Sequence, residues 1–93
     1  MNKSTSGLRT ALTSAQIRAA RALIRWSAED LARASALGVT TVRRAELAEA
    51  ATSLTAANDR SLRRALEDAG VEFIDENGGG AGVRLKEPPK KRS

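Results

Sequence analysis

Cysteine and histidine are both absent from this chain of 93 residues. Without cysteine, neither disulfide bonds nor thiolate metal sites can form. Without histidine, the chain lacks the usual general base of enzymes and the commonest metal ligand of proteins. We therefore predict that the protein has no metal site and no cofactor.

Aromatic residues are scarce, because Trp26 and Phe73 are the only two in the sequence. Hydrophobic residues make up 41% of the chain, but many of them are alanines. The core is therefore expected to be thin, and a small domain with a thin core is marginally stable as a monomer. This composition favours a partner subunit.

Long apolar segments are missing as well, and no run approaches the length that spans a membrane. The first 14 residues are basic and rich in Ser and Thr, as transit peptides are, but they lack the apolar segment of a secretory signal. A well-formed helix start follows them at once, which disfavours a transit peptide. We expect a cytoplasmic protein with no membrane partner.

The net charge of +5 is unevenly distributed. Residues 1–45 carry eight Lys/Arg and two acidic residues, whereas residues 46–83 carry three Lys/Arg and eight acidic residues. Residues 84–93 are basic again, with five Lys/Arg and one acidic residue. A basic first half suggests a polyanionic partner, of which nucleic acid is the commonest. The alternative is a solvated basic surface with no partner.

Capping signals and apolar spacing predict four short helices. Thr13 with Gln16, and Ser27 with Asp30, have the spacing of capping boxes, and Thr55 is a further N-cap candidate. The expected helices cover residues 14–25, 28–35, 39–46 (with an extension to 50 left open) and 56–69.

Arg21 falls within the predicted inward stripe of the first helix, and Glu46 falls on the inward face of the third. A guanidinium at an inward position needs an acidic partner, because an unpaired buried charge is costly. We predict that Arg21 and Glu46 form an ion pair that ties the first helix to the third.

The apolar period changes after Gly70, where residues 71–75 and 82–86 read as strands around the turn cluster 76–80. They predict a β-hairpin, which is only marginally stable alone and must pack on helices or on another chain. We favour a dimer contact through the apolar hairpin residues Phe73, Ile74, Val83 and Leu85. The alternative is that the hairpin covers its own helices.

The segment GVTTVRRAE, residues 38–46, combines hydroxyl and guanidinium side chains on the outward face of a short helix. A preceding helix and a tight turn at 36–38 complete a helix-turn-helix pattern, in which the second helix enters the DNA major groove. Threonine and arginine suit base edges and phosphates. Short basic helices are also common on solvated surfaces, so this alternative stays open.

Residues 16–46, QIRAARALIRWSAEDLARASALGVTTVRRAE, resemble the Cro/cI-type (lambda-repressor-like, XRE) helix-turn-helix regulators. Residues 70–85, GVEFIDENGGGAGVRL, resemble the hairpin that follows the DNA-binding helices in small bacterial members. The resemblance implies a mainly α fold: a four-helix lambda-repressor-like domain and a C-terminal two-stranded β-hairpin. The expected boundaries are a flexible arm at 1–11, the DNA-binding domain at 12–70, the hairpin at 71–86 and a disordered basic tail at 87–93.

The resemblance also implies roles for individual residues. The third helix becomes the recognition helix, in which Val39, Thr40 and Arg44 read bases, Arg43 reads bases or contacts phosphate, and Thr41 contacts the backbone. Ser27 sits against the DNA backbone, and the Arg–Glu pair of the family falls on Arg21 and Glu46. Other cations must supply the remaining phosphate contacts, and the candidates are Lys3, Arg9, Arg18 and Arg25, with solvated surface charge as the alternative for each.

Three positions depart from the family pattern. Ala28 replaces a glutamine that anchors to phosphate, so one backbone contact is lost. Ala36 replaces the usual turn glycine, which makes a positive φ less favourable. The segment after the recognition helix contains Glu49 and no basic residue.

These features predict a sequence-specific regulator that binds double-stranded DNA as a homodimer on an inverted repeat. It is expected to be a repressor or dual regulator with autoregulation, as in phages and mobile elements. The alternative is an antitoxin or adaptor that acts through a protein partner. An enzyme is disfavoured, because no catalytic set is present and the glycines at 78–80 precede a strand, not a helix that could receive phosphate.

Overall fold

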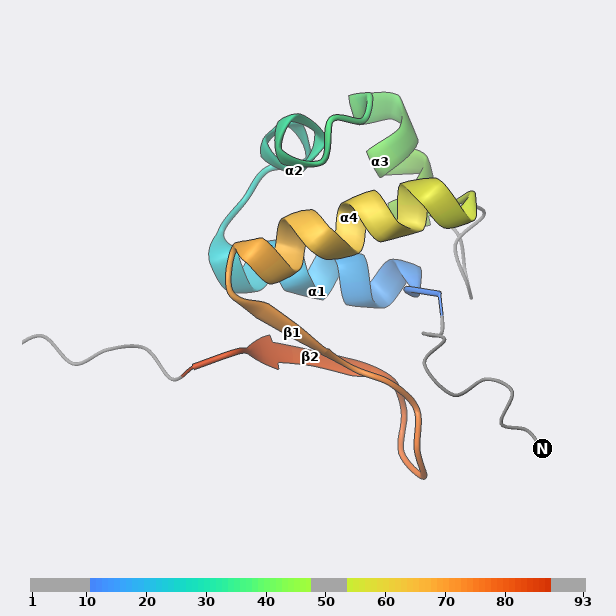
Figure 1. Ribbon diagram of the computed structural model, residues 1–93, viewed down its shortest axis with the longest axis vertical. Helices are drawn as coiled ribbons and strands as arrows, with labels where there is room; N and C mark the ends of the chain where they lie inside the picture. Colours follow the sequence, from blue (N-terminus) through green and yellow to red (C-terminus); the bar gives the residue numbers. More distant parts are fainter. Residues whose placement is uncertain (1–10, 48–53, 88–93) are drawn as a thin grey trace, which may run out of the picture.

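The computed structural model describes residues 11–47 and 54–87. This part of the chain forms four helices followed by a two-stranded antiparallel sheet (Figure 1). The elements are α1 (Ser14–Ile24), α2 (Ala28–Ser35), α3 (Val39–Leu47), α4 (Ala56–Asp68), β1 (Val71–Ile74) and β2 (Gly82–Leu85). The prediction of a mainly helical chain with a C-terminal hairpin is confirmed. The possible extension of the third helix to residue 50 lies outside the described residues.

The helices begin where their capping residues predict. The side chain of Thr13 accepts a hydrogen bond from the Gln16 N–H at 3.0 Å, and Gln16 Oε1 accepts one from the Thr13 N–H at 3.0 Å. Ser27 and Asp30 form the same reciprocal pair before α2, at 3.0 and 2.9 Å. Thr55 caps α4. These side chains satisfy N–H groups that a helix leaves free at its start.

Both α1 and α2 end on a left-handed residue that is not glycine. Arg25 has φ 60° and Ala36 has φ 61°. The Leu37 N–H then donates to the Ala32 carbonyl at 3.0 Å, which closes the last turn of α2 and redirects the chain toward α3. Ala36 thus adopts the positive φ that is less favourable for alanine than for glycine, at a cost of order 1–2 kcal/mol.

The core lies where the helices meet, and α2 packs on both α3 and α4 while α1 packs on α3 and on the hairpin. Its largest fully buried apolar side chains are Leu12, Ile17, Leu31, Val42, Leu62, Leu66 and Val71. In Figure 1, α2 and α3 lie on one side of α4 and α1, and the hairpin lies on the opposite side. The hairpin therefore leaves the outer face of α3 uncovered.

Two faces of the hairpin differ in character. Val71 is fully buried, and Phe73 and Val83, which pair across the strands, pack against the core. Glu72 and Arg84 pair on the opposite face, since side chains alternate along a strand. The hairpin thus covers its own helices with Phe73 and Val83, the alternative that the sequence left open for these residues.

The other two predicted dimer residues, Ile74 and Leu85, are half-buried. Leu85 pairs with Val71, on the face that packs toward the helices, whereas Ile74 falls by alternation on the face of Glu72. Ile74 and the strand edges are therefore the parts of the hairpin that remain open to a second chain. They offer less apolar surface than the sequence suggested.

Two buried polar residues of α1 connect distant parts of the chain. Gln16 Nε2 donates to the Gly82 carbonyl at 3.0 Å and to the Ile74 carbonyl at 3.4 Å, so the capping residue also holds the hairpin. Ser14 Oγ donates to the Ala45 carbonyl at 2.5 Å and so links the start of α1 to α3. Neither contact was predicted, because both partners lie far away in the sequence.

Candidate nucleic-acid interface

The segment from α2 to α3 forms a tight corner. After the left-handed Ala36, Gly38 begins the next helix, and its carbonyl accepts from the Val42 N–H at 3.2 Å. Val42 and Ala45 are buried, as their spacing predicts. The burial of these positions fixes which side of α3 faces solvent.

The solvent side of α3 carries Thr40, Arg43 and Arg44, all exposed. Residues three and four apart in a helix lie on one face, so the three side chains form a continuous surface, with Leu47 at its end. Leu47 is 80% exposed. The structure thus brings three of the four predicted base-reading residues together on an open face, which we call the α3 face.

Two predicted contact residues are less accessible than expected. Val39 is half-buried and packs against the core, so it helps to anchor the first turn of α3. Thr41, predicted to contact the DNA backbone, is also half-buried. α3 packs on α2, and this contact leaves less of its surface open to solvent.

Arg43 is joined to the neighbouring helix by an ion pair. Its Nη2 donates to Oε2 of Glu29 in the first turn of α2, and both side chains remain about half exposed, at 53% and 55%. This pair could not be predicted from the sequence, because the two residues are separated by a turn whose geometry short-range patterns do not define. Arg43 is consequently positioned by α2 as well as by α3.

The start of α2 is exposed and strongly polar. Ser27 caps the helix and is accessible to solvent, as a backbone contact requires. The hydrogen bonds that Asp30 accepts from the backbone and side chain of Ser27 lower the pKa of that carboxyl group, and Arg33 at 2.6 Å adds to the effect. Asp30 therefore stays ionised to lower pH than a free aspartate.

Arg21 and Glu46 form the predicted ion pair between α1 and α3. Arg21 Nε donates to Glu46 Oε2 at 2.7 Å and Nη2 donates to Oε1 at 2.9 Å, while Nη1 donates to the Trp26 carbonyl at 2.9 Å. These hydrogen bonds with Glu46 raise the pKa of Arg21, although partial burial opposes them. One guanidinium thus fixes α3 to α1 and to the start of the connection that leads to α2.

Arg18, predicted to contact phosphate, donates to the backbone carbonyl of Glu46 at 2.5 Å near the end of α3. Arg25 lies exposed at the end of α1. The other two predicted phosphate contacts, Lys3 and Arg9, lie outside the described residues, as do nearly all of the predicted arm and tail.

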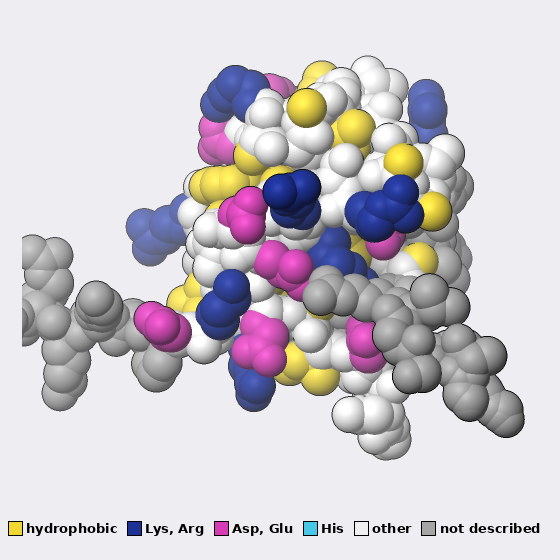
Figure 2. All heavy atoms as spheres, viewed as in Figure 1, with side chains coloured by type: hydrophobic (Ala, Val, Ile, Leu, Met, Phe, Trp, Pro, Cys, Tyr) yellow, Lys and Arg dark blue, Asp and Glu magenta, His cyan; other side chains and the backbone are white. Residues whose placement is uncertain are grey.

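The described residues preserve the charge asymmetry of the sequence. Residues 11–47 contain six arginines and three acidic residues, whereas residues 54–87 contain five Lys/Arg and seven acidic residues. Every acidic residue of the first range is paired with an arginine: Glu29–Arg43, Asp30–Arg33 and Glu46–Arg21. Within residues 11–47, the other three arginines, Arg18, Arg25 and Arg44, form no ion pair with a described residue, so they contribute unneutralised positive charge. By contrast, Figure 2 shows cationic and acidic side chains interspersed over the face of α4 and the hairpin.

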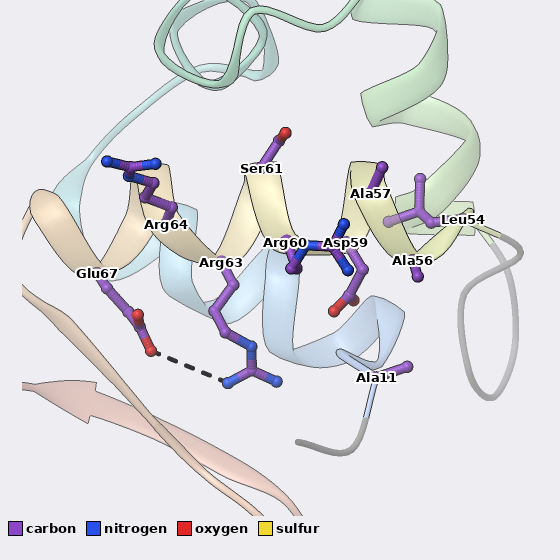
Figure 3. Close-up of a pocket in the computed structure, with 10 residues that line it drawn as sticks. All are labelled: Ala11, Leu54, Ala56, Ala57, Asp59, Arg60, Ser61, Arg63, Arg64 and Glu67. Atoms are coloured by element: carbon purple, nitrogen blue, oxygen red, sulfur yellow. Dashed lines mark ion pairs between the residues drawn. The ribbon is translucent and has the colours of Figure 1, made fainter. Parts of the chain in front are cut away.

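An open groove runs along α4, with a volume of about 920 Å³. Figure 3 shows Arg63 pointing from this helix toward the hairpin, with Glu67 beside it at 3.9 Å. Arg63 is buried, and its guanidinium lies 5.3 Å from the centre of the Phe73 ring. Asp59 accepts a hydrogen bond from the Leu12 N–H at 2.9 Å. Arg63 and Asp59 therefore hold neighbouring elements together, a role that the sequence analysis did not foresee for Arg63.

Residues 11–47 and 54–87 contain no cluster of acidic side chains suited to a metal ion, and none of their helices is long and apolar enough to cross a membrane. The chain matches no family model and no curated protein sequence.

Proposed function

We propose that this protein is a sequence-specific regulator of transcription that binds double-stranded DNA with α3. The observation that carries the proposal is the α3 face: Thr40, Arg43 and Arg44 are exposed together on a helix that the hairpin leaves uncovered. The pair Arg21–Glu46 holds that helix in a fixed orientation, as readout of base edges requires.

The dimensions and chemistry of α3 fit the major groove. An α-helix with its side chains is about 10–12 Å in diameter, and the B-DNA major groove, about 12 Å wide, admits one such helix. The Thr40 hydroxyl can donate or accept a hydrogen bond, and its methyl group can contact thymine. The Arg44 guanidinium forms no ion pair with another residue that the structure describes, and it can bind guanine through two hydrogen bonds or bind a phosphate.

The surroundings of α3 supply backbone contacts in this proposal. Ser27 lies at the exposed start of α2, and Arg25 adds positive charge at the end of α1. Arg18 has donors beyond the one used for the Glu46 carbonyl, so it can still reach a phosphate. Val39 supports the helix and offers a smaller apolar contact than the sequence suggested.

One α3 reads few base pairs, so we further propose a homodimer on an inverted repeat. The resemblance to Cro/cI-type helix-turn-helix regulators supports this proposal, and by that analogy we propose a bacterial cytoplasmic repressor or dual regulator with autoregulation. Ile74 and the strand edges of the hairpin are the proposed dimer contact.

The test is selection of a duplex from a randomised DNA pool by the purified full chain, followed by footprinting on DNA upstream of its own gene. We expect enrichment of one inverted-repeat motif and protection of a matching site. Failure to enrich any duplex, together with recovery of a stoichiometric protein partner from the source cells, would favour the antitoxin or adaptor alternative.

A further inference from the structure

The ion pair between Glu29 and Arg43 lies directly beside the proposed DNA-binding face. Glu29 belongs to the first turn of α2, and Arg43 lies at the middle of the α3 face. Because α2 and α3 pack against each other, the two side chains meet across the groove between the helices. Glu29 is favourably placed near the positive end of α2, but it also puts a negative charge beside a surface proposed to bind a polyanion.

The structure assigns to Glu29 the role of a specificity-determining residue that acts through Arg43. This inference rests on the proposed function. The Glu29 carboxylate holds Nη2 of Arg43, which keeps the guanidinium on the α3 face and away from neighbouring phosphates. Nε and Nη1 of Arg43 make no hydrogen bond with another described residue and remain available to an acceptor on a base.

The energetic consequence follows from the difference between phosphates and bases. A free arginine binds any phosphate, which raises the affinity for all DNA sequences equally. A guanidinium held in one position raises the affinity only for a sequence that places a suitable base edge opposite it. The negative charge of Glu29 also disfavours a phosphate close to Arg43. Glu29 therefore lowers affinity for random DNA more than affinity for the cognate site.

Neighbouring groups agree with a role exerted mainly through Arg43, because the charge of Glu29 is only the smallest of the causes that raise the pKa of Arg21. Asp30 is already committed to the helix cap and to Arg33, and Glu46 is committed to Arg21. Glu29 is thus the acid of residues 11–47 that contacts a residue of the α3 face. Its removal leaves the capping box of α2 and the α1–α3 pair intact.

The test compares the full chain with Glu29→Gln, which removes the charge and keeps the size. Fluorescence anisotropy measures Kd for a duplex selected by the wild-type protein and for a random-sequence duplex of equal length, across a salt series. We expect Glu29→Gln to bind the random duplex about fivefold more tightly near 0.1 M salt, and to steepen the slope of log K against log salt by about 0.9, the effect of one added phosphate contact. Binding to the selected duplex should tighten less, so that the specificity ratio falls.

Two controls separate this role from simpler ones. Glu76→Gln removes an equal charge from the exposed hairpin turn, far from α3, and should change neither Kd by more than about twofold. In an Arg43→Ala background, Glu29→Gln should also lose its effect. The role of Glu29 as a residue acting through Arg43 would be overturned if Glu76→Gln tightened DNA binding as much as Glu29→Gln does. It would also be overturned if Glu29→Gln tightened binding to the same extent in the Arg43→Ala background. Absence of duplex binding by the wild-type chain would instead overturn the proposed function itself.

Discussion

Arg21 of α1 and Glu46 of α3 are joined by a bidentate ion pair, with distances of 2.7 and 2.9 Å. The side chain of Glu46 is 9% exposed and that of Arg21 is 24% exposed. A carboxylate in this position depends on its partner, because water reaches it poorly. The pair therefore adds to the core packing that holds α3 in its orientation relative to the rest of the domain.

Replacement of Arg21 by alanine should leave the Glu46 carboxylate buried without a counter-charge. We expect a loss of about 2–3 kcal/mol in the free energy of unfolding, or a Tm lower by roughly 10 °C or more, by calorimetry. Replacement of both residues by methionine should cost less than Arg21→Ala, since no buried charge remains. The control Arg84→Ala, which breaks the exposed pair with Glu72, should leave Tm nearly unchanged. If the melting curve of Arg21→Ala matched that of this control, the pair would have no role in stabilising the fold.

Replacement of Ala36 by glycine should stabilise the protein. The left-handed conformation of Ala36 is costly for alanine and not for glycine, although glycine adds entropy to the unfolded chain. The net gain is expected to be about 0.5–1 kcal/mol in chemical denaturation. Ala34→Gly is the matched control, because Ala34 lies exposed within α2, where glycine costs about 1 kcal/mol. We therefore predict that Ala36→Gly raises the free energy of unfolding and that Ala34→Gly lowers it. Equal destabilisation by both variants would contradict this prediction.

Asp30 should make stability dependent on pH on the acid side. Its pKa is lower in the folded chain, so the unfolded state takes up the proton first and stability is lost as the pH falls through the folded pKa. The free energy of unfolding of the wild type should therefore be higher than that of Asp30→Asn at neutral pH. The two values should converge in strong acid, as measured by urea titrations at several pH values. Arg33→Ala keeps the Ser27 hydrogen bonds, which are the larger cause, and should retain most of this dependence. A pH-independent difference between wild type and Asp30→Asn would contradict the expectation.

Arg44→Ala tests whether the α3 face reads sequence. If Arg44 binds a base, the variant should lose about tenfold or more in affinity for the selected duplex, or ~1–3 kcal/mol, and much less for random DNA. Arg84→Ala removes an exposed arginine from the hairpin, on the opposite side of the molecule from α3, and serves as the control for charge. Equal losses on both duplexes would show that Arg44 contacts only phosphate.

The sequence by itself determined the local structure of this protein. Capping residues such as Thr13, Ser27 and Thr55 carry their partners within a few positions, so the helix starts were predictable from short spacing. The inward placement of Arg21 and Glu46 was also predictable, because helical periodicity placed both charges on inward faces and an isolated buried charge is too costly.

Only the tertiary structure decided the contacts between segments that are distant in the chain. The hydrogen bonds of Gln16 with the hairpin, the stacking of Arg63 on Phe73 and the pairing of Arg43 with Glu29 depend on how the helices are oriented. No local pattern encodes those orientations, since they follow from the packing of the whole core. For the same reason the sequence could name Phe73 and Val83 as apolar hairpin residues, but only the fold showed that they face the protein's own helices.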